Sequence, residues 1–211
     1  MQPSLTELAE KYACNKFYGD HKYGPIYERL FETQRQNIIH MCEIGIFRGN
    51  SARVWLDYFP GTVLYGVDWN EDCRHAVNHD RFVPIIKHQN DRSIWNEMAD
   101  GMDLVVDDGS HHPADQIETF FNGFMKLRAG GLWIIEDCHT SFSPEYIPQG
   151  LGVFSFVLDR IVELQMYGHG YGDFYRARKE MRQSLGWMGI NVFSIQVFKS
   201  FVVIEKAEDM I

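Results

Sequence analysis

Residues 104–112, LVVDDGSHH, show the fold class most clearly, because an apolar run ends abruptly in two carboxylates and two imidazoles. An unbroken run of Leu and Val is typical of a strand that is buried on both faces, as in a parallel sheet covered by helices. In such sheets, ligands bind beyond the carboxyl ends of the strands. The stretch therefore predicts a parallel α/β sheet with a reactive loop at its carboxyl edge.

Other apolar runs along the chain extend this sheet. Strands are predicted at 38–46, 63–68, 82–87 and 132–137, and helices at 52–58, around 95–98, at 114–127 and at 153–167. The runs 192–198 and 201–205 are separated by only two residues, which predicts an antiparallel hairpin. The expected fold class is α/β: a Rossmann-like, mostly parallel seven-stranded sheet with a C-terminal antiparallel hairpin and helices on both faces.

The length of 211 residues fits a single domain, and three parts are expected within it. They are an N-terminal helical cap or lid (1–36), a ligand-binding core (37–137), and a substrate loop, helix and terminal hairpin (138–211). For residues 15–25 the composition favours a cap over a lid that touches a ligand. The glycine-rich residues 168–173 predict a hinge.

Composition and charge exclude several kinds of partner. A net charge of -9 without any long run of Lys or Arg argues against nucleic acid, because phosphate contacts require a basic surface. Cys14, Cys42, Cys73 and Cys138 form no CxxC pair and are expected to be reduced core thiols. The chain shows neither a leader-like apolar segment nor a run of about 20 apolar residues. We expect a cytoplasmic protein without a membrane partner.

A glycine turn follows the first predicted strand. Gly45 and Gly49 are spaced so that the backbone can turn tightly and approach a ligand, and Ser51 can cap the helix that follows. The second predicted strand ends in Asp68, roughly 20 residues after the turn, where an acid can hold ribose hydroxyls. Glu43 adds a carboxylate at the end of the first strand. Together these residues favour nucleoside binding over a purely structural turn.

Two neighbouring predicted strands each end in a pair of acids, at 107–108 and at 136–137. Carboxylates this close repel one another unless a cation joins them, and hard divalent cations such as Mg²⁺ prefer oxygen ligands. Helix caps and buried hydrogen bonds are the alternative explanation. A similar choice remains at Asp91, which is expected either to contact a base edge or to cap a helix.

These motifs resemble those of class I S-adenosylmethionine-dependent methyltransferases, and specifically the metal-dependent sugar O-methyltransferases of the macrocin and mycinamicin type. The resemblance covers roughly residues 10–142, and its DDGSHH and IED elements are the specific part. The segments that carry it are EIGIFRG at 43–49, DYFP at 57–60, GVD at 66–68, DDGSHHP at 107–113, GGLWIIED at 130–137, and the N-terminal residues 15–16 and 21–23.

The resemblance implies roles for individual residues. Asp108, Glu136 and Asp137 would bind Mg²⁺ or another divalent cation, and His111 would be the catalytic base. The residues that would hold S-adenosylmethionine are Glu43, Gly45, Gly49, Ser51, Asp68, Asp91 and Asp107, with Lys16 and Tyr23 from the segment over the cofactor.

The expected activity is therefore methyl transfer from S-adenosylmethionine to a sugar hydroxyl of a glycosylated natural product or glycan. The expected acceptor is a small molecule or glycan with adjacent hydroxyls. Two other functions remain open, namely a metal-dependent hydrolase that uses the same acids and imidazole to activate water, and a non-catalytic binding subunit with the same fold. A homo-oligomer is among the expected assembly states.

Overall fold

The computed structural model describes residues 2–19, 21–146, 152–165 and 187–208. Within these residues, seven strands form one sheet in the order β3-β2-β1-β4-β5-β7-β6. The strands are β1 His40–Ile44, β2 Val63–Asp68, β3 Phe82–Ile86, β4 Met102–Asp107, β5 Leu127–Ile135, β6 Val192–Phe198 and β7 Phe201–Lys206. Strands β1 to β5 pair in parallel, whereas β7 is antiparallel to both β5 and β6. The predicted mixed sheet with a terminal hairpin is confirmed.

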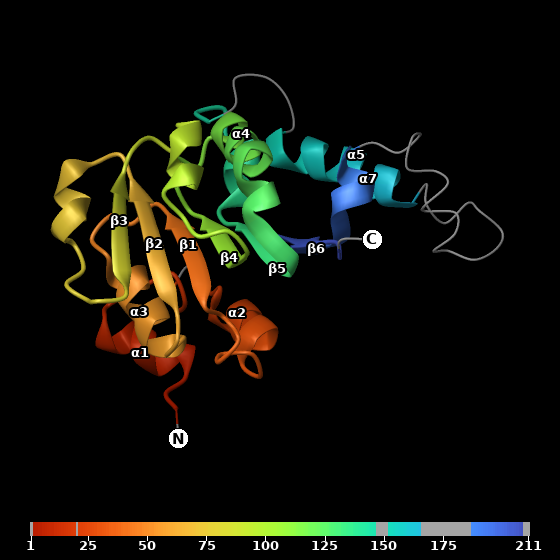
Figure 1. Cartoon of the computed structure of the whole chain (residues 1–211). Helices are drawn as coiled ribbons and strands as arrows, with labels where there is room; N and C mark the ends of the chain where they lie inside the picture. Colours follow the sequence, from red (N-terminus) through yellow and green to blue (C-terminus); the bar gives the residue numbers. More distant parts are fainter. Residues whose placement is uncertain (1, 20, 147–151, 166–186, 209–211) are drawn as a thin grey trace.

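Helices cover both faces of this sheet (Figure 1). The α-helices are α1 Leu5–Lys11, α2 Gly24–Phe31, α3 Asn50–Tyr58, α4 Pro113–Gly123, α5 Gly152–Gln165 and α7 Trp187–Asn191. Helices α1 to α3 lie below the sheet in Figure 1, and α4, α5 and α7 lie above it. In β4, Val106 packs into the core on the face covered by α1 to α3. Val105 packs into the core on the face covered by α4, α5 and α7. No helix in the described residues has both the length and the apolar character needed to cross a membrane.

The N-terminal segment is anchored through aromatic side chains. Helix α1 begins with a capping box formed by Ser4 and Glu7. The rings of Phe17 and Tyr27 are buried against Trp55 of α3, with centroid distances of 4.9 Å and 4.8 Å. This packing holds the start of the chain against the carboxyl edge of the sheet.

The strand register brings three turns to the same level. Ile44 of β1 pairs with Asp107 of β4, which pairs with Ile135 of β5. The ladder continues one step further, because the amide of Asp108 donates to the Ile44 carbonyl (3.0 Å) and that of Glu136 to the Asp107 carbonyl (3.0 Å). The residues after β1, β4 and β5 therefore face one another at one edge of the sheet.

Some element boundaries differ from the prediction. The helix expected around 95–98 is a short 3-10 helix, η2 Arg92–Asn96, and a further 3-10 helix, η1 Glu71–His75, follows β2. Strand β5 starts at Leu127, five residues before the predicted strand. Leu127 pairs with Met102, and the register is irregular between this pair and the next. Short 3-10 helices also follow α4 and β5, at η3 Phe124–Lys126 and η4 Cys138–Phe142. The predicted hinge at 168–173 lies outside the described residues.

Candidate active site at the carboxyl edge of the sheet

A cavity of about 540 Å³ opens where the turns after β1, β4 and β5 meet the N-terminal segment. Eight of the predicted site residues line it: Lys16, Tyr23, Gly45, Ser51, Asp108, His111, Glu136 and Asp137. They come from parts of the chain that are far apart in sequence. The fold thus brings the glycine turn and the acidic turns to one cavity.

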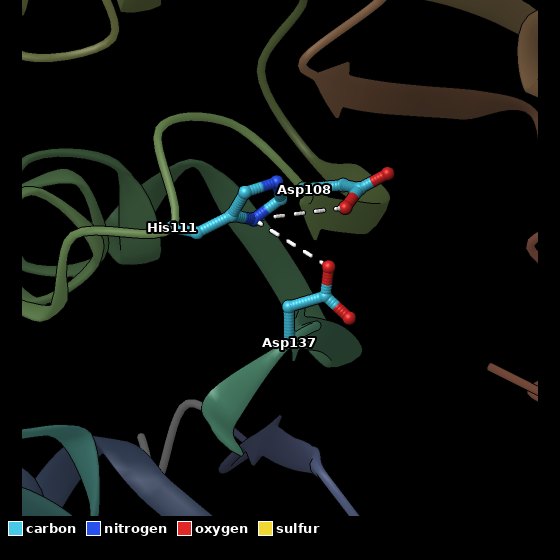
Figure 2. Close-up of side chains that lie close together, drawn as sticks. All are labelled: Asp108, His111 and Asp137. Atoms are coloured by element: carbon cyan, nitrogen blue, oxygen red, sulfur yellow. Dashed lines mark ion pairs between the residues drawn. The ribbon is translucent and has the colours of Figure 1, made fainter. Parts of the chain in front are cut away.

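Two carboxylates and an imidazole converge in this cavity. One ligand atom from each of Asp108, His111 and Asp137 lies within 4.8 Å of the others. Figure 2 shows the imidazole of His111 pointing toward both carboxylates, with its Nδ1 3.7 Å from Oδ2 of Asp137 and 4.0 Å from Oδ1 of Asp108. Both distances are too long for a hydrogen bond, and Nδ1 is buried without a hydrogen-bond partner among the described residues. The arrangement leaves room for a cation or a polar ligand atom.

The backbone is strained at two members of this cluster. His111 and Asp137 both have positive φ, +59° and +53°, which is uncommon outside glycine and is often found at functional sites. The hydroxyl of Thr140 in η4 donates to the carbonyl of His111 (2.8 Å) and so ties the β4 turn to the β5 turn. These constraints hold the imidazole over the carboxylates.

The N-terminal segment supplies donors to the acids. The Nζ of Lys16 lies 2.8 Å from Oε1 of Glu43, 2.8 Å from Oδ2 of Asp108 and 3.3 Å from Oε2 of Glu136. The hydroxyl of Tyr23 donates to Oδ1 of Asp137 (2.6 Å). The same oxygen lies 3.2 Å from Nδ1 of His21.

Burial and charge shift the ionisation of this group. Burial alone lowers the pKa of Lys16, but the carboxylates of Asp108, Glu136 and Glu43 outweigh it and raise that pKa well above the usual value. Burial raises the pKa of Glu136, with Lys16 acting in the opposite direction and Asp108 adding to the rise. Lys16 therefore stays a cation inside the acidic cluster.

The glycine turn is packed directly against the acidic turn. Gly45 has a φ of +91°, and a Cβ added there would lie 2.0 Å from the carbonyl oxygen of Asp108. Asp68 stabilises the turn, because its Oδ2 accepts hydrogen bonds from the amides of Ile46 (3.1 Å) and Phe47 (2.9 Å). A second cavity of about 120 Å³ lies beyond Gly45, with Asp68 in its lining.

Two predicted cofactor residues, Glu43 and Gly49, line neither cavity, whereas Ser51 lines the larger one. Glu43 is fully buried and accepts hydrogen bonds from Lys16 (2.8 Å), Ser51 (3.0 Å) and Trp55 (3.0 Å). Gly49 rather than Ser51 is the N-cap of α3, so the predicted capping role of Ser51 is wrong. The hydroxyl of Ser51 donates to the carboxylate of Glu43 instead.

Asp91 and Asp107 line neither cavity. The carboxylate of Asp91 caps η2 by accepting from the amide of Ser93 (2.9 Å), which is the second of the two roles expected from the sequence. Asp107 is fully buried beneath the acidic turn, and burial raises its pKa to about 7. Its Oδ1 accepts from the amide of Gly109 (3.3 Å), so it supports the turn.

Three further residues shape the site without having been predicted. Tyr27 donates a short hydrogen bond to Oε1 of Glu136, and the Thr140 hydroxyl holds His111 as described above. Oε1 of Gln89 accepts from the amide of Ser110 (2.7 Å). In the sequence, Tyr27 looks like one more apolar position of an amphipathic helix, and Gln89 and Thr140 belong to no motif.

Comparisons with known proteins give this site a family context. No protein-family model matches the chain. The demethylmacrocin O-methyltransferase of Streptomyces fradiae is 34% identical over 155 residues, which cover 69% of this chain and 39% of that protein. The mycinamicin VI 2''-O-methyltransferase of Micromonospora griseorubida is 27% identical across 99% of this chain and 54% of its own length.

Solved structures agree with these relatives. The MycE methyltransferase of the mycinamycin biosynthetic pathway, in complex with Mg and SAH, matches with a TM-score of 0.84 and 27% identity, over 99% of this chain and 55% of that one. The chain spans about half the length, or less, of the curated relatives it matches, from 38% to 54%. The chain belongs to the class I S-adenosylmethionine-dependent methyltransferases, and its homologues are the sugar O-methyltransferases of natural-product pathways.

Proposed function

We propose that the chain is an S-adenosylmethionine- and Mg²⁺-dependent O-methyltransferase that acts on a sugar hydroxyl of a glycosylated natural product or glycan. Its relatives are named for this reaction, and one MycE structure contains Mg, SAH and mycinamycin VI. The observation that carries the proposal is the convergence of Asp108, His111 and Asp137 on one cavity with the glycine turn. The hydrolase and binding-subunit alternatives are not favoured, because the relatives named above are O-methyltransferases.

The donor atoms of the acidic cluster fit a hard divalent cation. Asp108 and Asp137 each turn one carboxylate oxygen toward a buried imidazole nitrogen that has no hydrogen-bond partner. In the proposal, these two acids and Glu136 hold Mg²⁺, because this ion prefers oxygen ligands. When bound, the cation supplies Lewis acidity that makes a sugar hydroxyl easier to deprotonate.

The glycine turn fits a nucleoside ligand. Gly45 lies between the larger and the smaller cavity and contributes to the lining of both. In the proposal, Gly45 and Asp68 would hold S-adenosylmethionine, which would supply the methyl group. Backbone atoms at Gly45 can approach such a ligand closely, because glycine carries no side chain.

His111 then has the role of catalytic base. Methyl transfer is an in-line displacement, so the protein must align the acceptor hydroxyl and remove its proton. Among the described residues the Nδ1 of His111 has no hydrogen-bond partner, so in the proposal it accepts that proton. Mg²⁺ favours oxygen over nitrogen ligands, which leaves the imidazole available as the base.

The proposal extends to the surroundings of the site. Residues 138–211 are proposed to receive the acceptor, and the side chain of Phe142 in η4 is 66% exposed beside the acidic turn. The net charge of -9 supports a small-molecule or glycan acceptor rather than nucleic acid. The four free cysteines support a cytoplasmic location, and a homo-oligomer remains part of the proposal.

Transfer of a labelled methyl group to a panel of deoxysugar conjugates and glycans, followed by mass spectrometry, tests this function. We expect activity to disappear with a chelator and return with Mg²⁺. Asp137→Asn should reduce activity strongly, because it removes the charge of a proposed metal ligand. Asparagine is chosen because it tolerates the positive φ at this position. Asp100→Asn is the matched control, since the Asp100 side chain is 92% exposed. Activity that is indifferent to the chelator would exclude the metal-dependent reaction.

Replacement of His111 tests the base. His111→Asn keeps a residue that tolerates the positive φ, and we expect it to lower kcat by about 10²–10⁴-fold while S-adenosylmethionine affinity stays unchanged. His112→Asn is the control, because His112 is exposed and its side chain makes no capping hydrogen bond. Calorimetry measures the affinity, and a kcat equal to that of the parent protein would remove His111 as the base.

A further inference from the structure

Lys16 occupies an unusual position for a lysine. Its residue is only 8% exposed, and its ammonium group contacts three carboxylates at once. Two of them, Asp108 and Glu136, are proposed metal ligands. A buried ammonium in such a place is costly unless the carboxylates compensate it, so its charge is tied to this cluster.

The contacts of each carboxylate oxygen distinguish two kinds of acid among the proposed metal ligands. Asp108 gives Oδ2 to Lys16 and turns Oδ1 toward His111. Asp137 gives Oδ1 to Tyr23 and turns Oδ2 toward the same imidazole. Each of these two acids therefore keeps one oxygen directed into the cluster.

Glu136 differs, because both of its oxygens are engaged by the N-terminal segment. Oε1 accepts from the hydroxyl of Tyr27, and Oε2 lies 3.3 Å from Nζ of Lys16. The contact to Lys16 is the longest of the three that the ammonium makes. A metal that uses Glu136 must therefore take an oxygen from Tyr27 or from Lys16, and the Lys16 contact is the weakest of the three that the ammonium makes.

The charges of the cluster also indicate that a divalent cation would displace Lys16 from some of these acids. Glu43, Asp108 and Glu136 surround a single ammonium, and Asp137 lies beside them. A divalent cation is attracted to the same oxygens and repelled by Lys16. Glu43 lies on the far side of the cluster and has further partners in Ser51 and Trp55, so it can retain the ammonium when the other two acids leave it.

We propose that Lys16 is a positioning residue that serves as an internal counter-ion of the metal site. Before a metal binds, its ammonium holds Asp108 and Glu136 together. Metal binding is then an exchange, in which the divalent cation takes these carboxylates and Lys16 stays paired with Glu43. The inference rests on the proposed metal site. It adds that Lys16 competes with the divalent cation for the carboxylates of that site.

Calorimetric titration with Mg²⁺ alone tests the exchange. Lys16→Gln retains an amide that can donate to carboxylates but removes the charge, so we expect Mg²⁺ to bind at least about tenfold more tightly than in the parent protein. The thermal midpoint should be lower than that of the parent without Mg²⁺ and should rise more when Mg²⁺ is added, because the metal replaces the missing charge. Lys16→Arg keeps the charge and should bind Mg²⁺ as the parent does.

Lys11→Gln is the matched control, since it removes the same charge from an exposed lysine of the N-terminal segment that pairs with Asp57. Its Mg²⁺ affinity should equal that of the parent. Equal or weaker binding by Lys16→Gln would overturn the counter-ion role, whereas a parent protein that binds no Mg²⁺ would overturn the metal site itself.

A second measurement follows Lys16 in the parent protein itself. In the parent protein, the NMR signal of the Lys16 side-chain ammonium, assigned from its loss in Lys16→Arg, should shift as Mg²⁺ is added. The signal of Lys11 should stay in place. A Lys16 signal that does not move while Mg²⁺ binds would contradict the exchange.

Discussion

At the scale of single residues, the site depends on close packing between the turns as much as on its acids. Gly45 touches the backbone of Asp108, so the glycine turn and the acidic turn cannot move independently. The amide of Asp108 also donates to the carbonyl of Ile44, one residue before this glycine. Any group added at Gly45 would therefore displace Asp108 together with the turn.

Gly45→Ala tests this coupling. The added Cβ would lie 2.0 Å from the Asp108 carbonyl, and the φ of +91° is unfavourable for alanine, so we expect the free energy of unfolding to fall by about 2–5 kcal/mol. Urea denaturation measures the loss. Gly61→Ala is the control, because its nearest atom would be Cδ1 of Ile39 at 3.4 Å, and its change should stay within about 1 kcal/mol. Equal stability of the two variants would contradict the close-packing argument.

The meeting of the acids at one edge of the sheet could be predicted from the sequence, whereas their hydrogen-bond partners could not. Carboxylates at the ends of neighbouring strands indicate a shared edge, because parallel strands end together. By contrast, the partner of Glu136 is Tyr27, which lies 109 residues earlier in the chain and has the spacing of an ordinary core residue. Nothing local distinguishes a buried tyrosine that donates to a carboxylate from one that only packs.

At the scale of elements, the strand register explains why the acids meet. Strands with unbroken apolar runs were predicted well, since burial on both faces leaves a clear signal. The short elements between them were predicted less well. The segment after β3 has enough apolar residues for a helix, but it forms only the 3-10 helix η2, which Asp91 caps and which contains Trp95. Tertiary packing decided between the two forms, and a single sequence does not carry that information.

Asp103 fixes this register at the opposite edge of the sheet. Its Oδ2 accepts from the amides of Ile39 (2.8 Å) and His40 (2.8 Å) at the start of β1, and its Oδ1 accepts from Nε of Arg128 in β5 (2.5 Å). One buried carboxylate in β4 therefore links the two strands on either side of it.

Asp103→Ala should lower the free energy of unfolding by about 2–4 kcal/mol, because it leaves two backbone amides and a guanidinium without their acceptor. Asp100→Ala removes a solvent-exposed ion pair with Lys126 from the same region, and its effect should be below about 1 kcal/mol. Chemical denaturation of both variants compares them directly. A loss at Asp103 no larger than the loss at Asp100 would show that the register does not depend on this carboxylate.

At the scale of the whole molecule, two apolar cores lie on the two faces of one sheet, and the site lies at its carboxyl edge. Length and hydrophobic pattern were enough to predict this architecture. They could not predict how the N-terminal segment closes over the acids, because Lys16 and Tyr23 lie in a stretch without a regular pattern and Tyr27 has the spacing of an ordinary core residue.

The same closure determines the order in which the site can assemble during folding. The hydrogen bond from Tyr23 to Asp137 spans 114 residues, and that from Tyr27 to Glu136 spans 109. Contacts between such distant residues form late, since closing a long loop costs entropy before any contact repays it. Until then the acids lack their N-terminal donors, and Lys16 reaches Asp108 and Glu136 only when the N-terminal segment packs against the sheet.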